Sequence, residues 1–250
     1  MHSKKLLTVI VLTLNEEDVL PLCLSSLSWA DDKVVVDSGS TDRTCEIAVE
    51  YGARLIHRQF DNYASQRNAA LCATESDWVL FVDADEIVSS ELASSILSVI
   101  EDRSEVGWLI PRHNYIFGKL ILHAGWFPDY QLRLFRRKLG HYSENRPVHE
   151  VLEIEGSIGK LNYPITHNNY SDVSEFIEKQ VYYANYEANA MKLQNIKPRF
   201  HNYFVEPLRH FCWRFFMLSG WKSGYHGLLL SILMAYSRYV VYRQLAALYK

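Results

Sequence analysis

Short apolar runs alternate with helical patterns over the first hundred residues of the chain. Four short apolar runs predict strands at 6–14, 33–41, 53–60 and 78–86. Apolar positions at helical spacing predict helices at 17–29, 42–51, 63–73 and 89–102. The second helix can be capped by Ser40 or Thr41 and ends at Gly52. This alternation is typical of an α/β fold in which helices flank a mostly parallel sheet.

The pattern changes after residue 105. Residues 107–170 are aromatic, glycine-rich and polar, which indicates antiparallel strands. Beyond residue 172 the chain reads as helical to its end, with a break at Lys197-Pro198. We therefore divide the chain into three parts, at 1–105, 106–172 and 173–250.

Polar side chains follow three of the predicted parallel strands. They are Asn15-Glu16-Glu17, Asp37-Ser38-Gly39-Ser40 and Asp83-Ala84-Asp85-Glu86. Ligands of open parallel sheets bind outside the carboxyl ends of the strands. One site can therefore gather all three clusters.

The stretch WVLFVDADE, residues 78–86, runs an apolar strand directly into three carboxylates. Burying ionised carboxylates is costly unless a positive charge meets them. Residues two apart in an extended strand share a side, so Asp83 and Asp85 can face one cation. Mg²⁺ and Mn²⁺ prefer oxygen ligands, and Mg²⁺ is often shared with substrate phosphates. The alternative is a solvated strand end, because this short motif is common by chance.

Composition and cysteine spacing narrow the class of protein. The chain is 48% hydrophobic, which excludes a disordered protein. Its four cysteines are far apart, without zinc-site or disulfide spacing, as expected in a reducing cytosol. The apolar run behind Lys4 and Lys5 resembles a signal peptide, but it contains threonines and lacks a cleavage site. A first core strand is the better interpretation.

The net charge of −3 hides an asymmetry along the chain. Residues 192–250 hold nine Lys or Arg and one acid, a balance of +8, and the preceding residues hold 17 basic and 28 acidic residues, a balance of −11. The segment 209–245 mixes Trp, Phe and Tyr with Arg and Lys, which is typical of elements at a membrane interface. We expect peripheral contact with an anionic membrane. The alternative is a pair of helices packed on the main domain, and no nucleic-acid-binding fold accompanies the charge.

Three motifs together resemble a known family. TVIVLTLNEE, VVVDSGSTDRT and WVLFVDADE, in this order, resemble the nucleotide-sugar-binding half of family 2 glycosyltransferases, whose fold is called GT-A. GWFPDYQLRLFRR and NRPVHE are similar to segments of bacterial enzymes that add glucose to the inner core of lipopolysaccharide or lipooligosaccharide. Leu14 stands where the family usually has an aromatic residue. The resemblance makes residues 1–105 the nucleotide-sugar-binding half, 106–172 the acceptor-binding half and 173–250 a membrane-associating extension.

The resemblance also implies a donor site. Its nucleotide-sugar-binding residues are Thr13, Glu16, Asp37, Arg67 and Asp83. Thr13 and Glu16 line the uridine pocket, Asp37 bonds the uracil, and Arg67 approaches the base or the diphosphate. Asp83 lies near the ribose and the metal, and Asp85 is the principal ligand of Mg²⁺ or Mn²⁺. The metal stabilises the negative charge that develops on the leaving diphosphate.

Inverting transfer also needs a base, because the acceptor hydroxyl loses a proton as it attacks. We predict Glu150 as this base and His149 as a further metal or phosphate contact, with a partly buried structural histidine as the alternative for His149. The predicted acceptor-binding residues are Arg112, Trp126, Asp129, Arg133 and Arg136. Trp offers a flat face to a sugar, and Arg suits the phosphate or carboxylate of an anionic glycolipid. A solvated basic strand edge is the alternative.

These observations predict a metal-dependent, inverting glycosyltransferase on the cytoplasmic face of the inner membrane. Its expected donor is UDP-glucose, and its acceptor is a heptose of the lipopolysaccharide inner core. One alternative is a catalytically silent glycolipid- or membrane-binding protein with the same fold. A second is a phosphatase of the haloacid-dehalogenase type, which also begins with a strand ending in D-x-D but needs a later acidic pair that this chain lacks.

Overall fold

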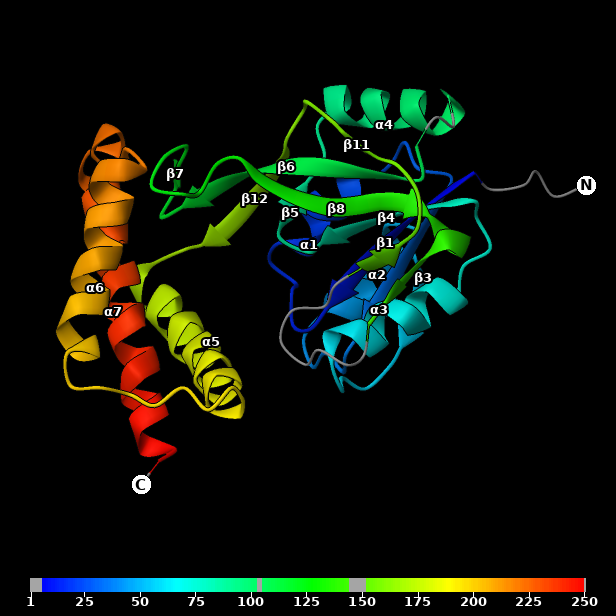
Figure 1. Cartoon of the computed structure of the whole chain (residues 1–250). Coiled ribbons are helices and arrows are strands. Elements are labelled where there is room, and N and C mark those ends of the chain that lie inside the picture. Colours follow the sequence, from blue (N-terminus) through cyan, green and yellow to red (C-terminus); the bar gives the residue numbers. More distant parts are fainter. Residues whose placement is uncertain (1–5, 103–104, 144–151, 250) are drawn as a thin grey trace, which may run out of the picture. The chain divides into compact units, whose positions relative to one another are not determined.

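The computed structural model describes residues 6–102, 105–143 and 152–249 (Figure 1). The chain forms two compact units. The first unit comprises Met1–Arg112 and Tyr130–His167, and the second comprises His113–Asp129 and Asn168–Lys250. The predicted division into a nucleotide-sugar-binding half (1–105), an acceptor-binding half (106–172) and a membrane-associating extension (173–250) stays a prediction about function.

The first unit begins with the predicted alternation of strands and helices. Its elements in chain order are β1 (Leu7–Thr13), α1 (Leu20–Ser25), β2 (Asp32–Asp37), α2 (Thr44–Glu50), β3 (Arg54–His57), α3 (Tyr63–Cys72), β4 (Trp78–Asp83), β5 (Glu86–Ile87) and α4 (Ser90–Asp102). Further strands are β6 (Gly107–Ile116), β8 (Asp129–Arg136), β9 (Gly140–Tyr142), β10 (Leu152–Ile154), β11 (Ile158–Lys160) and β12 (Ile165–Tyr170), with the short 3-10 helix η1 (Arg137–Leu139). Parts of β6, β8 and β12 belong to the second unit. The α/β prediction is confirmed.

The sheet combines a parallel part with an antiparallel part. Its strand order is β3-β2-β1-β4-β8-β6-β12-β5. β1 pairs in parallel with β2 on one side and with β4 on the other, whereas β8 is antiparallel to β4. The chain order therefore reverses between β1 and β4, which is where open α/β sheets bind ligands.

Alternate residues of the strands pack on opposite faces of this sheet. Val9 and Val11 of β1 belong to a cluster with apolar residues of α1, α2 and α4, and Ile10 belongs to a second cluster with residues of α3. Successive side chains of a strand point to opposite faces, so a strand covered on both faces must be apolar throughout. The core of the first unit thus explains the continuous apolar runs in the sequence.

The predicted strand over residues 78–86 is interrupted. β4 ends at Asp83, Ala84 and Asp85 form a turn, and Glu86 starts β5. β5 pairs with β12, with His167 opposite Glu86, instead of extending the pairing of β4. The inference that Asp83 and Asp85 share one side of an extended strand is therefore wrong, because the backbone turns between them.

The predicted cap of the second helix is also wrong, although its end is confirmed. α2 starts at Thr44, and the Asp42 carboxylate accepts a hydrogen bond from the Thr44 N–H at 3.0 Å. Ser40 instead accepts a hydrogen bond from the Asn15 N–H at 2.8 Å, and the Thr41 N–H donates to the Asn15 side chain at 2.8 Å. Gly52 follows the helix with a φ of 70°, a left-handed conformation that favours glycine.

The second unit contains the predicted C-terminal helices. They are α5 (Val173–Leu193), α6 (Asn202–Cys212), the π-helix η2 (Trp213–Met217), the 3-10 helix η3 (Gly220–Ser223) and α7 (Tyr225–Ala247). The predicted break at Lys197-Pro198 is confirmed, because it lies between α5 and α6. A hairpin containing β7 (Lys119–Leu120) joins these helices through a cluster that includes Ile121, Phe176 and Leu230. Within the described ranges, we find no helix with both the length and the hydropathy of a membrane span.

Candidate active site

The three polar clusters meet at one edge of the parallel sheet, as predicted. Thr13 at the end of β1 is paired with Asp37 at the end of β2. On the other side of β1, Leu12 is paired with Asp83 at the end of β4. Parallel neighbours end at the same edge, so strand pairing alone brings these side chains together. The edge is the candidate site.

Asp37 is held in place by the loop that follows it. The carboxylate is 1% exposed and accepts hydrogen bonds from the Gly39 N–H at 2.9 Å, the Ser40 N–H at 3.0 Å and the Ser40 hydroxyl. Gly39 has a φ of 102°, so the loop can curl back over the carboxylate. Burial opposes ionisation, but the hydrogen bonds from Ser40 and Gly39 lower the pKa of Asp37. Asp37 is thus an ionised, fixed acceptor.

The loop after β1 is tied to the same segment. The Asn15 side chain accepts a hydrogen bond from the Thr41 N–H at 2.8 Å, and the Glu16 N–H donates to the Thr44 hydroxyl at 2.8 Å. Thr13 is buried, and its hydroxyl lies 3.5 Å from an Asp37 oxygen. These bonds fix Thr13 beside Asp37 and tie the loop of Glu16 to the start of α2.

Asp83 is met by arginines of the chain itself. Arg133 of β8 contacts both carboxylate oxygens, with one distance of 3.0 Å, and Arg67 of α3 lies 3.5 Å from one of them. Burial opposes ionisation of Asp83, but the charges of Arg133, Arg67 and Arg112 hold the pKa of that carboxyl well below its usual range. The sequence predicts a positive charge facing the carboxylate cluster. For Asp83, arginine side chains of the protein supply this charge.

Arg67 combines this ion pair with two aromatic contacts. Its guanidinium lies 4.8 Å from the ring centre of Phe81 and 5.5 Å from that of Tyr142. The residue is 7% exposed. Aromatic faces attract cations, and together with Asp83 they hold Arg67 at the edge of the site.

Glu86 is the residue of the DADE cluster that the site prediction left out. It is fully buried, accepts the Asp83 N–H at 2.9 Å and accepts Arg133 at 3.1 Å, and Arg112 lies 3.6 Å away. Burial raises the pKa of Glu86, and the neighbouring Asp83 charge adds to this rise against the effect of Arg133. Glu86 supports the turn that carries Asp85.

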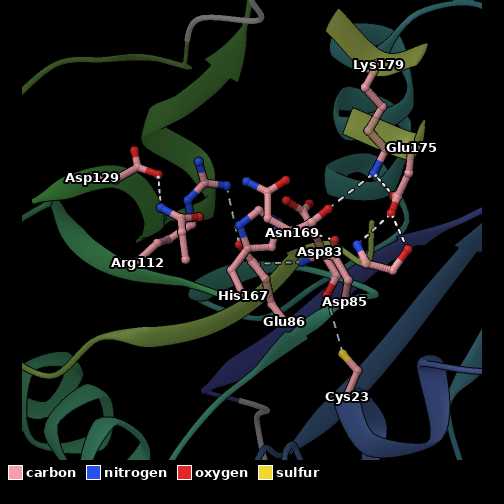
Figure 2. A network of polar contacts seen from close by, with 12 residues as sticks. Cys23, Asp83, Asp85, Glu86, Arg112, Asp129, His167, Asn169, Glu175 and Lys179 are labelled. Carbon is pink, nitrogen blue, oxygen red and sulfur yellow. Dashed lines mark hydrogen bonds and ion pairs between the residues drawn. The ribbon is translucent and has the colours of Figure 1, made fainter. Parts of the chain in front are cut away.

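Asp85 points toward a histidine that the sequence interpretation missed. The Nε2 atom of His167 lies 3.3 Å from an Asp85 oxygen, and the two residues lie close together in Figure 2. His167 is 7% exposed, whereas the Asp85 side chain keeps 27% of its surface exposed. No local signal singles out His167, because only the pairing of β12 with β5 brings it here.

The donor atoms suit a divalent cation at Asp85 better than at Asp83. Both oxygens of Asp83 are engaged by Arg133, which leaves little capacity for a metal. Asp85 offers carboxylate oxygens, and His167 offers an imidazole nitrogen beside them. Carboxylate and imidazole are ligand types that Mn²⁺ accepts, while Mg²⁺ prefers oxygen. The residues therefore fit a divalent cation held mainly by Asp85.

The predicted acceptor residues fall into both units. In the first unit, Arg133 is 6% exposed and engaged with Asp83 and Glu86, and the Arg136 guanidinium lies 5.3 Å from the ring centre of Trp78. In the second unit, Trp126 packs against the cluster around Phe176, and Asp129 accepts a hydrogen bond from the Asn114 amide at 3.2 Å. Arg133 thus contacts carboxylates of the predicted donor site.

Two predicted residues cannot be placed. Glu150, the predicted base, and His149, the predicted further contact, lie outside the described residues. Their roles stay predictions.

Comparison with known proteins gives a consistent result. The family profile described as glycosyl transferase family 2 matches residues 8–148. The lipopolysaccharide core biosynthesis glycosyltransferase LpsC of Rhizobium meliloti is 29% identical over 92% of this chain and 87% of its own length. An uncharacterized glycosyltransferase of Rickettsia conorii is 26% identical over 94% of this chain and 87% of its own length.

Solved structures share the fold at lower identity. Glucosyl-3-phosphoglycerate synthase from Mycobacterium tuberculosis, in complex with Mn²⁺ and UDP-glucose, is 19% identical and covers 75% of this chain and 78% of its own, with a TM-score of 0.51. S. aureus TarS is 19% identical and covers 98% of this chain and 55% of its own, with a TM-score of 0.51. The sheet and its flanking helices therefore share the fold of these two proteins.

Proposed function

Since the chain belongs to glycosyl transferase family 2, we propose that it transfers glucose from UDP-glucose, with inversion, to a heptose of the lipopolysaccharide inner core. The relative LpsC is named for lipopolysaccharide core biosynthesis, which supports this class of acceptor. The mycobacterial enzyme was solved with Mn²⁺ and UDP-glucose, which makes this pair the first to test on the shared fold. The identity of the hexose and the heptose acceptor are part of the proposal.

The edge of the parallel sheet binds the nucleotide in this proposal. Thr13 and Glu16 line the uridine pocket, and Asp37 hydrogen-bonds the uracil. Arg67 approaches the base or the diphosphate, and Asp83 lies near the ribose. The support is the preorganised geometry, because Asp37 and the loop of Glu16 are already fixed by hydrogen bonds. Little ordering is then left to oppose binding.

Asp85, with His167 beside it, would hold Mg²⁺ or Mn²⁺. When bound, the cation neutralises the charge that develops on the departing diphosphate. Arg133 keeps Asp83 ionised and in place below this position. Glu86 braces the turn between the two aspartates through the Asp83 N–H.

Glu150 acts as the base that takes the proton of the acceptor hydroxyl, which attacks the anomeric carbon from the face opposite the diphosphate. His149 supplies a further metal or phosphate contact. The residues that bind the anionic glycolipid in this proposal are Arg112, Arg136, Trp126 and Asp129. For Arg133, engagement with Asp83 and Glu86 supports a role in holding the donor side instead. Such an acceptor places the enzyme on the cytoplasmic face of the inner membrane, peripherally bound.

The observation that carries this proposal is the Asp85 carboxylate facing His167 at the edge where β1, β2 and β4 end. The test measures UDP release from UDP-glucose with a truncated-core acceptor, with added Mn²⁺ or Mg²⁺ and with chelator. We expect Asp85→Asn and His167→Ala to lose activity, Asp85→Asn by roughly 100-fold or more, because transition-state charge is left unneutralised. Asp102→Asn on α4, an exposed acid, is the matched control.

Chelator should abolish turnover of the wild-type protein and weaken UDP binding in calorimetry. Turnover that survives both chelator and Asp85→Asn would contradict the metal-dependent proposal. Glycolipid binding without any release of UDP would favour the catalytically silent alternative, and hydrolysis of a phosphomonoester would favour the phosphatase.

A further inference from the structure

The helix α6 and the following η2 expose a row of apolar side chains. We call this set the outer apolar stripe, and it consists of Phe204, Val205, Leu208, Trp213, Phe216 and Met217. Their exposed fractions range from 43% for Trp213 to 79% for Met217. Phe204, Val205 and Leu208 share one side of α6, because residues three and four apart are neighbours on a helix. Trp213, Phe216 and Met217 are related in the same way within η2. Contiguous apolar surface of this kind marks an interaction site.

The opposite side of α6 is no more apolar than the exposed one. Tyr203, whose ring centre lies 6.1 Å from that of Tyr239, and the half-buried Glu206 and His210 lie on this inner side. No residue of α6 itself is fully buried. A helix on a water-facing surface normally turns its polar residues outward. The arrangement in α6 and η2 is reversed, as expected for an element whose outer side leaves water.

The stripe also borders a groove. A cavity of about 670 Å³ is lined by Arg209, His210, Cys212, Trp213, Phe216 and Met217. Arg209 supplies a cation at the edge of an otherwise mainly apolar surface. An apolar groove with a cation at its edge suits a partner that is apolar inside and anionic at its boundary.

Cations lie at both ends of the stripe. At the start of α6, Lys197 and Arg199 line a pocket of about 470 Å³. At the far end, Lys222 is exposed. Glu206, the one acid between residues 192 and 250, forms an ion pair with Arg209 at 2.5 Å and exposes 17% of its side chain. The charges around the stripe are therefore complementary to an anionic partner.

We propose that the outer apolar stripe inserts into the interface of an anionic lipid bilayer, with α6 and η2 lying along the membrane plane. Aromatic side chains favour the headgroup level, and basic residues beside an apolar helix face add electrostatic attraction to anionic lipid. This inference rests on the proposed membrane association and names the face that provides it. It does not depend on the donor, the metal or the base.

The test uses the whole chain and vesicles of phosphatidylcholine with about 30% phosphatidylglycerol. This share of anionic lipid makes electrostatic attraction to the membrane measurable. Co-sedimentation should show binding of the wild-type chain and at least a tenfold weaker binding of Leu208→Glu/Phe216→Glu. The matched control is Val49→Glu/Leu193→Glu, which adds the same charge at residues that are 61% and 86% exposed elsewhere. The control should bind like the wild type.

One further measurement excludes a folding defect, and a second reports insertion into the bilayer directly. The thermal midpoint of Leu208→Glu/Phe216→Glu should match that of the control, because the substituted side chains are exposed. Bromine-labelled lipid should quench tryptophan fluorescence, and Trp213→Phe should lose part of this quenching.

Equal vesicle binding by both double variants would overturn the inference, and so would absence of binding by the wild type. A dimer that light scattering detects and that only Leu208→Glu/Phe216→Glu dissociates would assign the stripe to a second copy of the chain instead. Loss of UDP release with vesicle binding intact would contradict the proposed function alone.

Discussion

Arg133 is the shared positive partner of two carboxylates at the candidate site. It is almost fully buried and contacts Asp83 and Glu86 together, while Arg112 lies further from Glu86. A buried ion pair contributes little compared with an apolar replacement of the whole pair, but removing one partner leaves an uncompensated charge. Removal of Arg133 is therefore expected to destabilise the protein by more than the intact ion pair stabilises it.

We predict that Arg133→Met lowers the free energy of unfolding by about 3–5 kcal/mol, measured by urea denaturation, because the buried Glu86 and the partly exposed Asp83 lose their shared cation. Arg43→Met is the control, since its side chain is 65% exposed and its surface ion pairs contribute about 1 kcal/mol or less. Arg133→Met/Glu86→Gln should recover part of the loss. A loss for Arg133→Met as small as that of the control would show that water solvates this cluster.

Asp37 makes a pH-dependent contribution. Its pKa is lowered in the folded protein, against an unfolded value of ~3.9. Its stabilisation is therefore fully present above about pH 4 and is lost as pH falls through the lower folded pKa. We predict that Asp37→Asn is less stable than the wild type near neutral pH and that this difference shrinks below about pH 4. Denaturation between neutral and acidic pH measures it, and a difference independent of pH would contradict the assignment.

At the scale of elements, the turn between β4 and β5 separates two roles. β4 ends at Asp83, which pairs with arginines, and the turn presents Asp85 to His167 on β12. A continuous strand would place both carboxylates on one side, where like charges would raise each other's pKa. The turn instead gives each aspartate its own partner.

The contact between α7 and η3 depends on a glycine. A Cβ atom at Gly227 would lie 1.8 Å from the Gly220 carbonyl oxygen, far inside van der Waals contact. We predict that Gly227→Ala lowers the thermal midpoint and the free energy of unfolding by about 1–3 kcal/mol through overpacking. Ile232→Ala on the same helix, which is 49% exposed in the wild type, should change either quantity much less. Equal effects of the two substitutions would contradict close packing at Gly227.

At the scale of the whole molecule, charge is separated along the chain. Residues 192–250 carry +8 and the preceding residues carry −11. If the basic segment provides the attraction to an anionic bilayer, salt must weaken it by screening, while insertion of apolar side chains is much less sensitive to salt.

We therefore predict that vesicle binding of the wild-type chain falls steeply between about 0.05 and 0.5 M salt without vanishing, because the electrostatic part is screened and the apolar part persists. Vesicles of pure phosphatidylcholine should show only the weak, salt-independent part. Binding that is insensitive to both salt and lipid charge would contradict a role for the basic segment.

The sequence by itself determined the elements and the family. Runs such as LLTVIVLTL and WVLFVDADE predict buried parallel strands because a strand covered on both faces has to be apolar at every position. The meeting of the clusters at Asn15, Asp37 and Asp83 could also be predicted, since parallel strands end at one edge. These features depend on consecutive residues and on the rules of one sheet.

Only the tertiary structure decided the partners of these residues. Arg133 reaches Asp83 through the pairing of β8 with β4, and His167 reaches Asp85 through the pairing of β12 with β5. The outward direction of the stripe on α6 likewise depends on which side packs against the rest of its unit. Periodicity tells that a helix has two unlike sides, but it cannot tell which side faces water, because that choice is made by contacts between residues far apart in the chain.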